Sequence, residues 1–148
     1  PELGEGGRRV DELRVEAELA MARGELRHQA YPAAALRLGA LTRFRPLRWD
    51  LHHELGVAHW ETGKRALAEQ DYRRALALGA FPPSSMQQLV RLLVEEGRRA
   101  EAQAVIAAAR RRHDGDEEAL RHLTRLERFW QLGDDGATAP AAHRPPPG

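Results

Sequence analysis

The feature that most constrains this chain is a set of residues that recurs at an interval of 34 residues. Each set holds a glycine, an alanine, a larger aromatic or aliphatic residue and a second alanine: Gly63, Ala68, Tyr72 and Ala75, then Gly97, Ala102, Ile106 and Ala109. A period of this length is typical of stacked helical hairpins, in which each unit buries its apolar face only against its neighbours. The recurrence therefore predicts a helical solenoid, an architecture whose usual role is binding.

The composition allows one domain and removes several kinds of chemistry. The chain has 148 residues with 23 basic and 22 acidic side chains, so its net charge favours neither nucleic acid nor an anionic membrane as a partner. It has no cysteine, which excludes disulfides, thiol catalysis and cysteine-based metal sites. No apolar run approaches the roughly 18 residues that span a bilayer, so we expect no membrane insertion.

Helical hydrophobic spacing with short breaks divides the chain into hairpins. We predict three regions: a flexible tail at 1–8, a repeat domain at 9–132, and a disordered tail rich in proline, alanine and glycine at 133–148. Within the domain the spacing predicts hairpins at about 10–46, 49–82 and 83–116, and a capping helix at 117–132. The predicted fold class is all-α: a right-handed α-solenoid of about three helical hairpins with a C-terminal capping helix.

Small residues mark the predicted turns and the close contacts between helices. Gly63 and Gly97 stand where the two helices of a hairpin meet, and Gln29 stands where the first hairpin should have its turn glycine. Two antiparallel helices approach closely only where one presents a small side chain, so Gly56 is expected to face Tyr72.

Residues that cap helices mark two of the predicted helix starts. Ser84 and Ser85, which follow a pair of prolines, are candidate N-caps of the fifth helix. Asp116 is a candidate N-cap of the last helix, where two glutamates in the first turn would complement the helix dipole.

Residues 49–82 carry small and aromatic residues at fixed spacings: the pair Leu55-Gly56, then Gly63, Ala68, Tyr72, Ala75 and a closing Pro82. At these positions the segment resembles the tetratricopeptide repeat (TPR) family. Residues 84–116 resemble the same repeat in a degraded form, and the first hairpin keeps Ala34 and Pro46 in register. The resemblance covers about residues 10–132. It implies a scaffold or adaptor that binds a peptide or helix of a partner protein in a concave groove.

A narrower resemblance lies in three short segments: Arg45-Pro46-Leu47-Arg48 followed by Leu51, Gly63-Lys64-Arg65-Ala66, and Tyr72-Arg73-Arg74-Ala75. Over residues 10–75 the chain looks like the bacterial transcriptional activation domain of antibiotic-pathway regulators, itself TPR-like. This resemblance implies an alternative function as the partner-binding or dimerisation module of a bacterial transcription regulator. Such regulators usually carry a winged helix-turn-helix before this domain, and these residues show none.

The TPR resemblance implies that the first helix of each hairpin lines the groove. Helical spacing then selects the candidate partner-binding residues: Arg23, Leu26, Arg27, Asp50, His53, Val57, Trp60, Gln87, Arg91 and Val94. They combine an apolar streak with three arginines, and tryptophan and arginine often anchor interfaces. We therefore expect a partner protein that presents a peptide or helix with apolar anchors and acidic flanks. The alternative is that these side chains form only a solvated face.

No arrangement of residues indicates catalysis, so we expect no enzyme activity, no catalytic residues, no cofactor and no metal site. His52 and His59 are about 10 Å apart on one helix, too far to share an ion, and Val57 stands where a zinc-protease motif needs its second histidine. Both histidines are expected to be partly buried and hydrogen-bonded. A nucleic-acid-binding solenoid is a less favoured alternative, because no aromatic side chains are interleaved with the run Arg110-Arg111-Arg112 for stacking on bases.

Two further expectations concern assembly and location. If the last helix exposes Phe129 and Trp130, that patch could pair two chains into a homodimer. We expect a cytoplasmic protein. A periplasmic or secreted location stays open, because a chain that begins with Pro1 looks processed or truncated.

Overall fold

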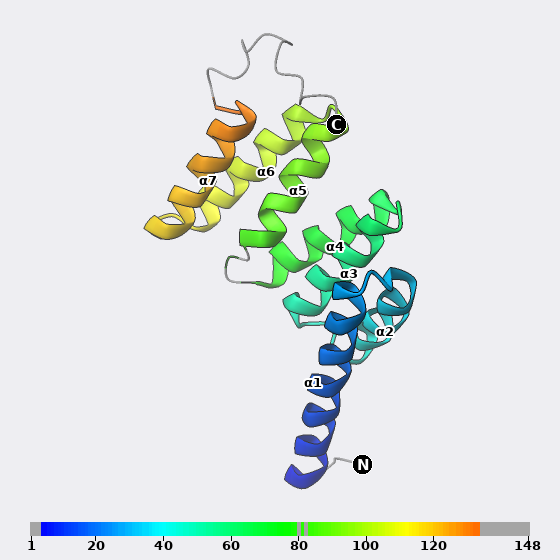
Figure 1. The fold of residues 1–148 in the computed structure, drawn as a ribbon. Coiled ribbons are helices and arrows are strands. Elements are labelled where there is room, and N and C mark those ends of the chain that lie inside the picture. The colour runs from blue at the N-terminus through cyan, green and yellow to red at the C-terminus, as the bar shows by residue number, and fades with distance from the viewer. Residues whose placement is uncertain (1–3, 80, 82, 134–148) are drawn as a thin grey trace. The chain divides into compact units, whose positions relative to one another are not determined.

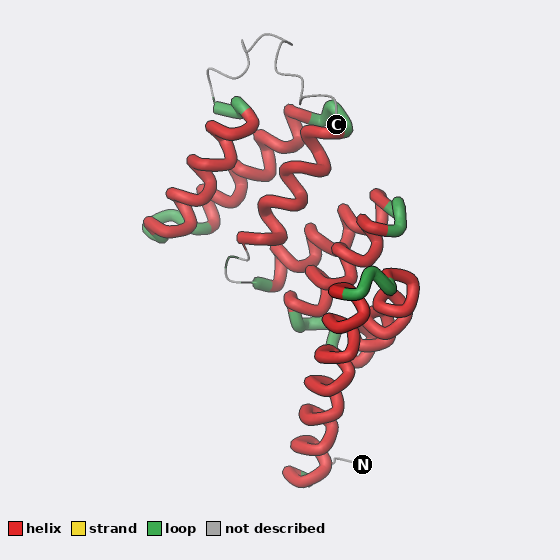
Figure 2. Tube along the Cα trace, in the orientation of Figure 1, coloured by secondary structure: helices red, strands yellow, loops and turns green. Residues whose placement is uncertain are grey.

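A computed structural model of the chain describes residues 4–79, 81 and 83–133. The described residues form seven α-helices, with no strand among them (Figures 1 and 2). The helices are α1 Glu5–Arg27, α2 Tyr31–Phe44, α3 Trp49–Glu61, α4 Arg65–Leu78, α5 Pro83–Glu95, α6 Arg99–Arg112 and α7 Glu117–Trp130. The predicted all-α class is confirmed. The C-terminal tail predicted at 133–148 lies outside the described residues, apart from Gly133.

The chain divides into two compact units, residues 1–85 and residues 86–148. In the first unit α1 packs on α2, both pack on α3, and α3 packs on α4. One cluster of buried side chains joins the first three helices: Val15, Leu19, Ala22, Ala34, Leu38, Leu41, Leu51, Leu55 and Ala58. The spacing of these residues by three and four positions is what turns one apolar stripe of each helix toward the shared core.

The first helix is longer than the sequence predicts. It begins at Glu5, so residues 5–8 are helical rather than part of a tail. The backbone N–H of Arg8 donates to the carbonyl of Gly4 at 3.1 Å. Extending an existing helix adds one hydrogen bond per residue without a new nucleation cost, which explains how the helix continues through two glycines.

Equivalent turns connect the two helices of each hairpin. In each hairpin, the residue that follows the C-cap of the first helix has a left-handed backbone conformation. The φ angles are 61° for Gln29, 77° for Gly63 and 76° for Gly97. The next residue then donates its N–H across the turn, as Lys64 does to the carbonyl of His59 at 2.8 Å. This pair of features is the Schellman ending of a helix. The turn is therefore the same in the three hairpins, although the first lacks the glycine.

Gly56 lies where α3 and α4 meet most closely. A Cβ built on it would lie 2.7 Å from Cε1 of Tyr72, which is buried. The predicted contact of Gly56 with Tyr72 is confirmed. Only a residue without a side chain lets the tyrosine ring approach the helix this closely.

The second unit is held by α6 and α7, which pack on one another. Asp116 caps α7, since its carboxylate accepts the N–H of Ala119 at 3.1 Å, as the sequence predicts. Arg110 on α6 binds the carboxylate of Glu127 on α7 at 2.6 Å. Apolar side chains of both helices, such as Ile106 and Leu123, are buried.

Candidate protein-binding face

The candidate binding residues lie on three helices and in both units. Arg23, Leu26 and Arg27 are on α1, and Asp50, His53, Val57 and Trp60 are on α3, all in the first unit. The remaining three, Gln87, Arg91 and Val94, are on α5 in the second unit.

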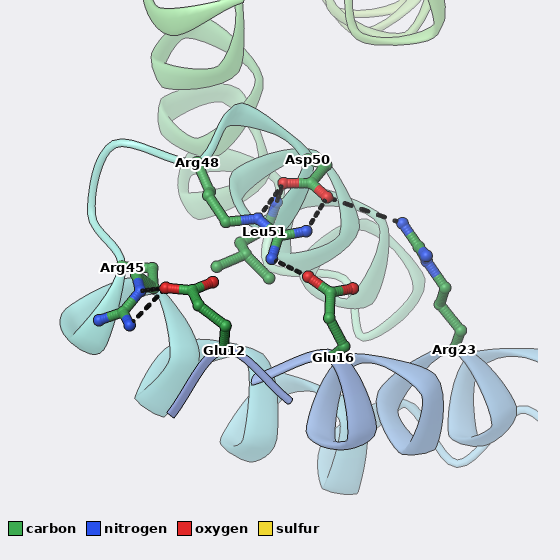
Figure 3. A network of polar contacts seen from close by, with 7 residues as sticks. All are labelled: Glu12, Glu16, Arg23, Arg45, Arg48, Asp50 and Leu51. Carbon is green, nitrogen blue, oxygen red and sulfur yellow. Dashed lines mark hydrogen bonds and ion pairs between the residues drawn. The ribbon is translucent and has the colours of Figure 1, made fainter. Parts of the chain in front are cut away.

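A network of ion pairs joins α1 to the start of α3 (Figure 3). Arg48, just before α3, donates two hydrogen bonds of 3.1 and 2.7 Å to the carboxylate of Asp50. Its third guanidinium nitrogen donates to Glu16 on α1. One turn earlier on α1, Glu12 accepts two hydrogen bonds from Arg45. Bidentate arginine–carboxylate pairs are among the strongest and most directional polar contacts. The bidentate pair fixes the Arg48 side chain, whose bond to Glu16 links α1 to the start of α3, and the bonds from Arg45 to Glu12 link α1 to the end of α2.

Arg23 and Asp50, both expected to meet a partner, take part in this network. Nε of Arg23 donates to Glu54 on α3 at 3.1 Å, and its Nη2 lies 3.9 Å from Asp50. Partial burial by itself would raise the pKa of Asp50, but the hydrogen bond and charge of Arg48, the backbone N–H of Leu51 and the charge of Arg23 together hold that pKa below its usual value. Asp50 is therefore charged and already paired. A ligand would have to compete with protein groups for both side chains.

His53 is also engaged within the protein. Its Nδ1 lies 2.7 Å from Oγ of Ser85 in a hydrogen bond, and its ring is tilted against that of Tyr72 at 5.7 Å. Burial lowers the pKa of His53, which favours the neutral ring. Ser85 is itself buried inside the first turn of α5, which begins at Pro83. The expectation that Ser84 or Ser85 caps this helix is wrong, because proline takes the first helical position and Ser85 serves a tertiary contact.

The apolar members of the face lie one helical turn further along. Leu26 is half-buried and packs against the core, while Val57 and Trp60 are half-buried on α3. The guanidinium of Arg65 lies over the ring of Trp60, 4.3 Å from its centre. One face of the indole is thus covered by a cation, which leaves the tryptophan held in place.

In the second unit, the three candidates lie on one helix. Nε of Arg91 donates to Glu95 at 2.9 Å, one turn along the helix. Gln87 is exposed and Val94 is half-buried. A solvent-facing pair of this kind contributes only a few tenths of a kcal/mol, about 0.3–0.5 kcal/mol, so a ligand carboxylate could replace Glu95 at little cost.

His52 and His59, which lie two turns apart on α3, each have a hydrogen-bond partner within the protein. Nε2 of His52 lies 2.8 Å from the carbonyl oxygen of Pro46, and Nδ1 of His59 lies 2.6 Å from Asp71. Both rings are partly buried, as predicted. Burial raises the pKa of Asp71, and the hydrogen bond from His59 acts in the opposite direction.

Comparison with known proteins finds no matching family model and no matching curated sequence. Solved structures do match. The Yersinia enterocolitica type III secretion chaperone SycD, in complex with a peptide of the translocator YopD, is 19% identical with a TM-score of 0.66, over 80% of this chain and 90% of that one. PcrH, in complex with the chaperone binding region of PopD, is 15% identical with a TM-score of 0.68, over 81% and 90%. The TPR2B domain of yeast Sti1 is 12% identical with a TM-score of 0.67, over 80% and 97%.

The fold is TPR-like. The three matched structures are each less than 20% identical in sequence to this chain, so the similarity shows the fold alone. They confirm the resemblance that the 34-residue recurrence indicated. None of the helices in the described part of the chain combines the length and hydropathy of a membrane span.

The first TPR-like hairpin also has a surface pocket that the sequence reasoning missed. It has a volume of about 690 Å³ and lies between α1 and α2. Its apolar lining includes the exposed side chains of Leu36 and Phe44, and Arg37 on its rim binds Glu18 and Glu25. The signal was present in the sequence, because Leu36 stands two positions from both Ala34 and Leu38 and so points away from the core.

Proposed function

We propose that the protein is a TPR-like adaptor that binds a peptide segment of a partner protein on the face shared by α1 and α3. The observation that carries this proposal is that several structures with the same fold are complexes with a segment of a partner protein. The matched structure of SycD contains a peptide of YopD, that of PcrH contains the chaperone binding region of PopD, and that of the Sti1 domain is a complex with pHsp70. Extended concave surfaces are the usual binding sites of helical solenoids.

The ion pairs show how the two helices are aligned on this face. Glu16 pairs with Arg48 and, two turns later, Arg23 pairs with Glu54, so α1 and α3 run in the same direction. Leu26 lies one turn beyond Arg23, and Val57 lies one turn beyond Glu54. A regular helix rises 5.4 Å per turn, so these two apolar side chains come level with each other.

The charges on this face refine the expected ligand. Arg23 and Asp50 are paired internally, whereas Arg27 is exposed and makes no ion pair among the described residues. An apolar anchor would contact Leu26 and Val57, and an acidic side chain next to it would reach Arg27. This is the peptide with apolar anchors and acidic flanks that the sequence led us to expect, with its acidic contact placed at one residue.

The test is a selection from a displayed peptide library on the immobilised protein, followed by affinity measurement with the selected peptides. Val57→Glu should weaken binding at least about tenfold, because it places an unpaired charge in the apolar contact. Leu67→Glu is the matched control, since Leu67 is an exposed leucine on α4, and it should leave affinity unchanged. Equal affinities for both variants, or loss of binding only in Leu36→Glu, would place the peptide elsewhere and refute the proposal for this face.

The other functions considered from the sequence remain untested. A module of a transcription regulator and a nucleic-acid-binding solenoid stay predictions, and nothing in the described residues favours either over peptide binding.

A further inference from the structure

Helix α1 carries a second apolar stripe opposite its core face. The core side is formed by Val15, Leu19 and Ala22, which are buried. On the opposite side, residues repeat at alternating steps of three and four positions: Val10, Leu13, Ala17, Ala20 and Gly24, with Met21 beside them. This spacing keeps side chains on one face of a helix and is the pattern of a helix–helix seam.

The stripe is open in the structure. Val10, Leu13 and Met21 are 63%, 65% and 53% exposed, and they are three of the nine large apolar side chains that the described residues expose. A Cβ added to Gly24 would meet only the end of the Arg27 side chain, at 3.8 Å. The first turns of α1 stand clear of α2, α3 and α4 in Figure 1. A second helix can therefore lie along this face without moving the first unit.

We infer that the occupant of this stripe is the α1 helix of a second copy of the chain, packed antiparallel with Ala17 at the two-fold axis. The reason is the order of side-chain sizes. Of the residues on the line of the stripe, the large Val10 and Leu13 lie in the first half, and the small Ala20 and Gly24 lie in the second half, with Met21 to one side. Antiparallel pairing about Ala17 places Val10 opposite Gly24 of the partner subunit. It places Leu13 level with Met21 of the partner subunit and one residue from Ala20 of the partner subunit. Val10 and Leu13 then each have a small residue of the partner beside them, and Met21 lies at the edge of the seam, so the helix axes can stay close.

A parallel arrangement does not share this property. It would place Val10 on Val10 of the partner subunit at one end and Gly24 on Gly24 of the partner subunit at the other. The helices would then be held apart at one end and leave a gap at the other, and unfilled space loses packing contacts. A self-complementary surface is also what an isologous two-fold interface requires.

Charges along one edge of the stripe support the same register. Arg14 makes no ion pair or hydrogen bond among the described residues, and Glu18 lies one turn further along on the same side. With Ala17 on the axis, Arg14 lies within two residues of Glu18 of the partner subunit, about 3 Å along the helix axis. The two-fold axis repeats this contact, so both arginines gain a carboxylate. Glu18 also accepts a hydrogen bond from Arg37 of its own chain, which extends the pair into a network.

The helix α7, which the sequence put forward for dimerisation, is the competing surface. Phe129 is 67% exposed, but Trp130 is half-buried and packs edge-on to it, with ring centres 4.9 Å apart. One exposed ring is a smaller apolar surface than the stripe on α1. We therefore treat dimerisation through α7 as an outcome that the experiment must separate.

Cross-linking tests the arrangement directly, because the chain has no native cysteine. A disulfide forms only where Cα atoms come within about 4–7 Å. Under mild oxidation Ala17→Cys should give a covalent dimer much faster than Ala107→Cys, an exposed alanine on α6. A mixture of Val10→Cys and Gly24→Cys chains should cross-link, and neither variant should do so alone. Rapid cross-linking of Val10→Cys alone would overturn the antiparallel arrangement.

Mass measurement by light scattering over a concentration series tests the dimer without cysteines. The unmodified chain should reach twice the monomer mass, and Ala17→Arg should raise the dimer dissociation constant at least about a hundredfold, because it buries two like charges at the axis. Ala107→Arg should not change it, and circular dichroism should show equal helicity in all three proteins. A chain that stays monomeric, or a dimer that survives Ala17→Arg and is lost in Phe129→Arg, would overturn the proposal.

Discussion

Replacing Gln29 with glycine should stabilise the protein, which is unusual for a substitution of any residue by glycine. Gln29 has φ 61°, in the left-handed region, at the turn between α1 and α2. Its side chain is exposed and makes no hydrogen bond or ion pair among the described residues. The substitution therefore removes backbone strain without removing a contact of the folded state.

The magnitude follows from two opposing terms. A left-handed conformation costs a residue with a side chain about 1–2 kcal/mol, because Cβ crowds the following carbonyl. Glycine has more freedom in the unfolded chain, and that freedom opposes folding by about 0.5–1 kcal/mol. We expect Gln29→Gly to raise the free energy of unfolding by about 0.5–1 kcal/mol, the difference between these terms.

The reverse substitution provides the matched control. Gly63 has φ 77° in the equivalent turn of the next hairpin, and a Cβ on it would meet nothing within 4 Å. Gly63→Gln should thus lower the free energy of unfolding by about 0.5–1 kcal/mol through the backbone alone. Urea unfolding followed by circular dichroism measures both variants, with equal slopes required for the comparison. A Gln29→Gly protein no more stable than the unmodified chain, beside a destabilised Gly63→Gln protein, would refute the reasoning.

Two further predictions concern the packing of the first unit. Gly56→Ala should destabilise the protein by about 1–3 kcal/mol in thermal unfolding, because the new methyl overlaps Tyr72, whereas Gly39→Ala, where the methyl would meet only a flexible side-chain end at 3.9 Å, should be neutral or stabilising. Burial lowers the pKa of His53 in the folded protein. Below about pH 6.5 the unfolded chain therefore protonates this histidine more readily than the folded protein does. Stability should therefore be lost as the pH falls from about 6.5 through the lowered pKa, and in His53→Phe this loss should be smaller. An equal loss in both proteins would rule out His53 as its source.

Much of the fold could be predicted because its signals are local. Helical spacing, the recurring small residues and the prolines act over one or two turns of chain, and they indicated an all-helical repeat. The contact of Gly56 with Tyr72 could also be predicted, because helices joined by a tight turn must pack antiparallel. The start of α1 could not, since the end of an exposed helix depends on small differences between helix and coil.

The candidate site was harder to predict, because its chemistry depends on partners distant in the chain. Helical spacing placed Arg23 and Asp50 on an outward face, yet it could not show that Arg23 on α1 pairs with Glu54 and Asp50 on α3. Ser85 shows the same limit. Serine is a preferred residue at helix N-caps, but the fold places Ser85 against His53, 32 residues earlier.

The sequence by itself determined the all-helical class of this protein, its repeat length, and the turns at Gly63 and Gly97. These properties follow from the backbone preferences and sizes of residues a few positions apart. Only the tertiary structure decided which charged residues of the candidate face pair internally and which, like Arg27, make no ion pair among the described residues. It also decided that the second stripe of α1 is exposed. Electrostatic pairing and burial depend on distances through space, and those distances exist only once the helices have packed.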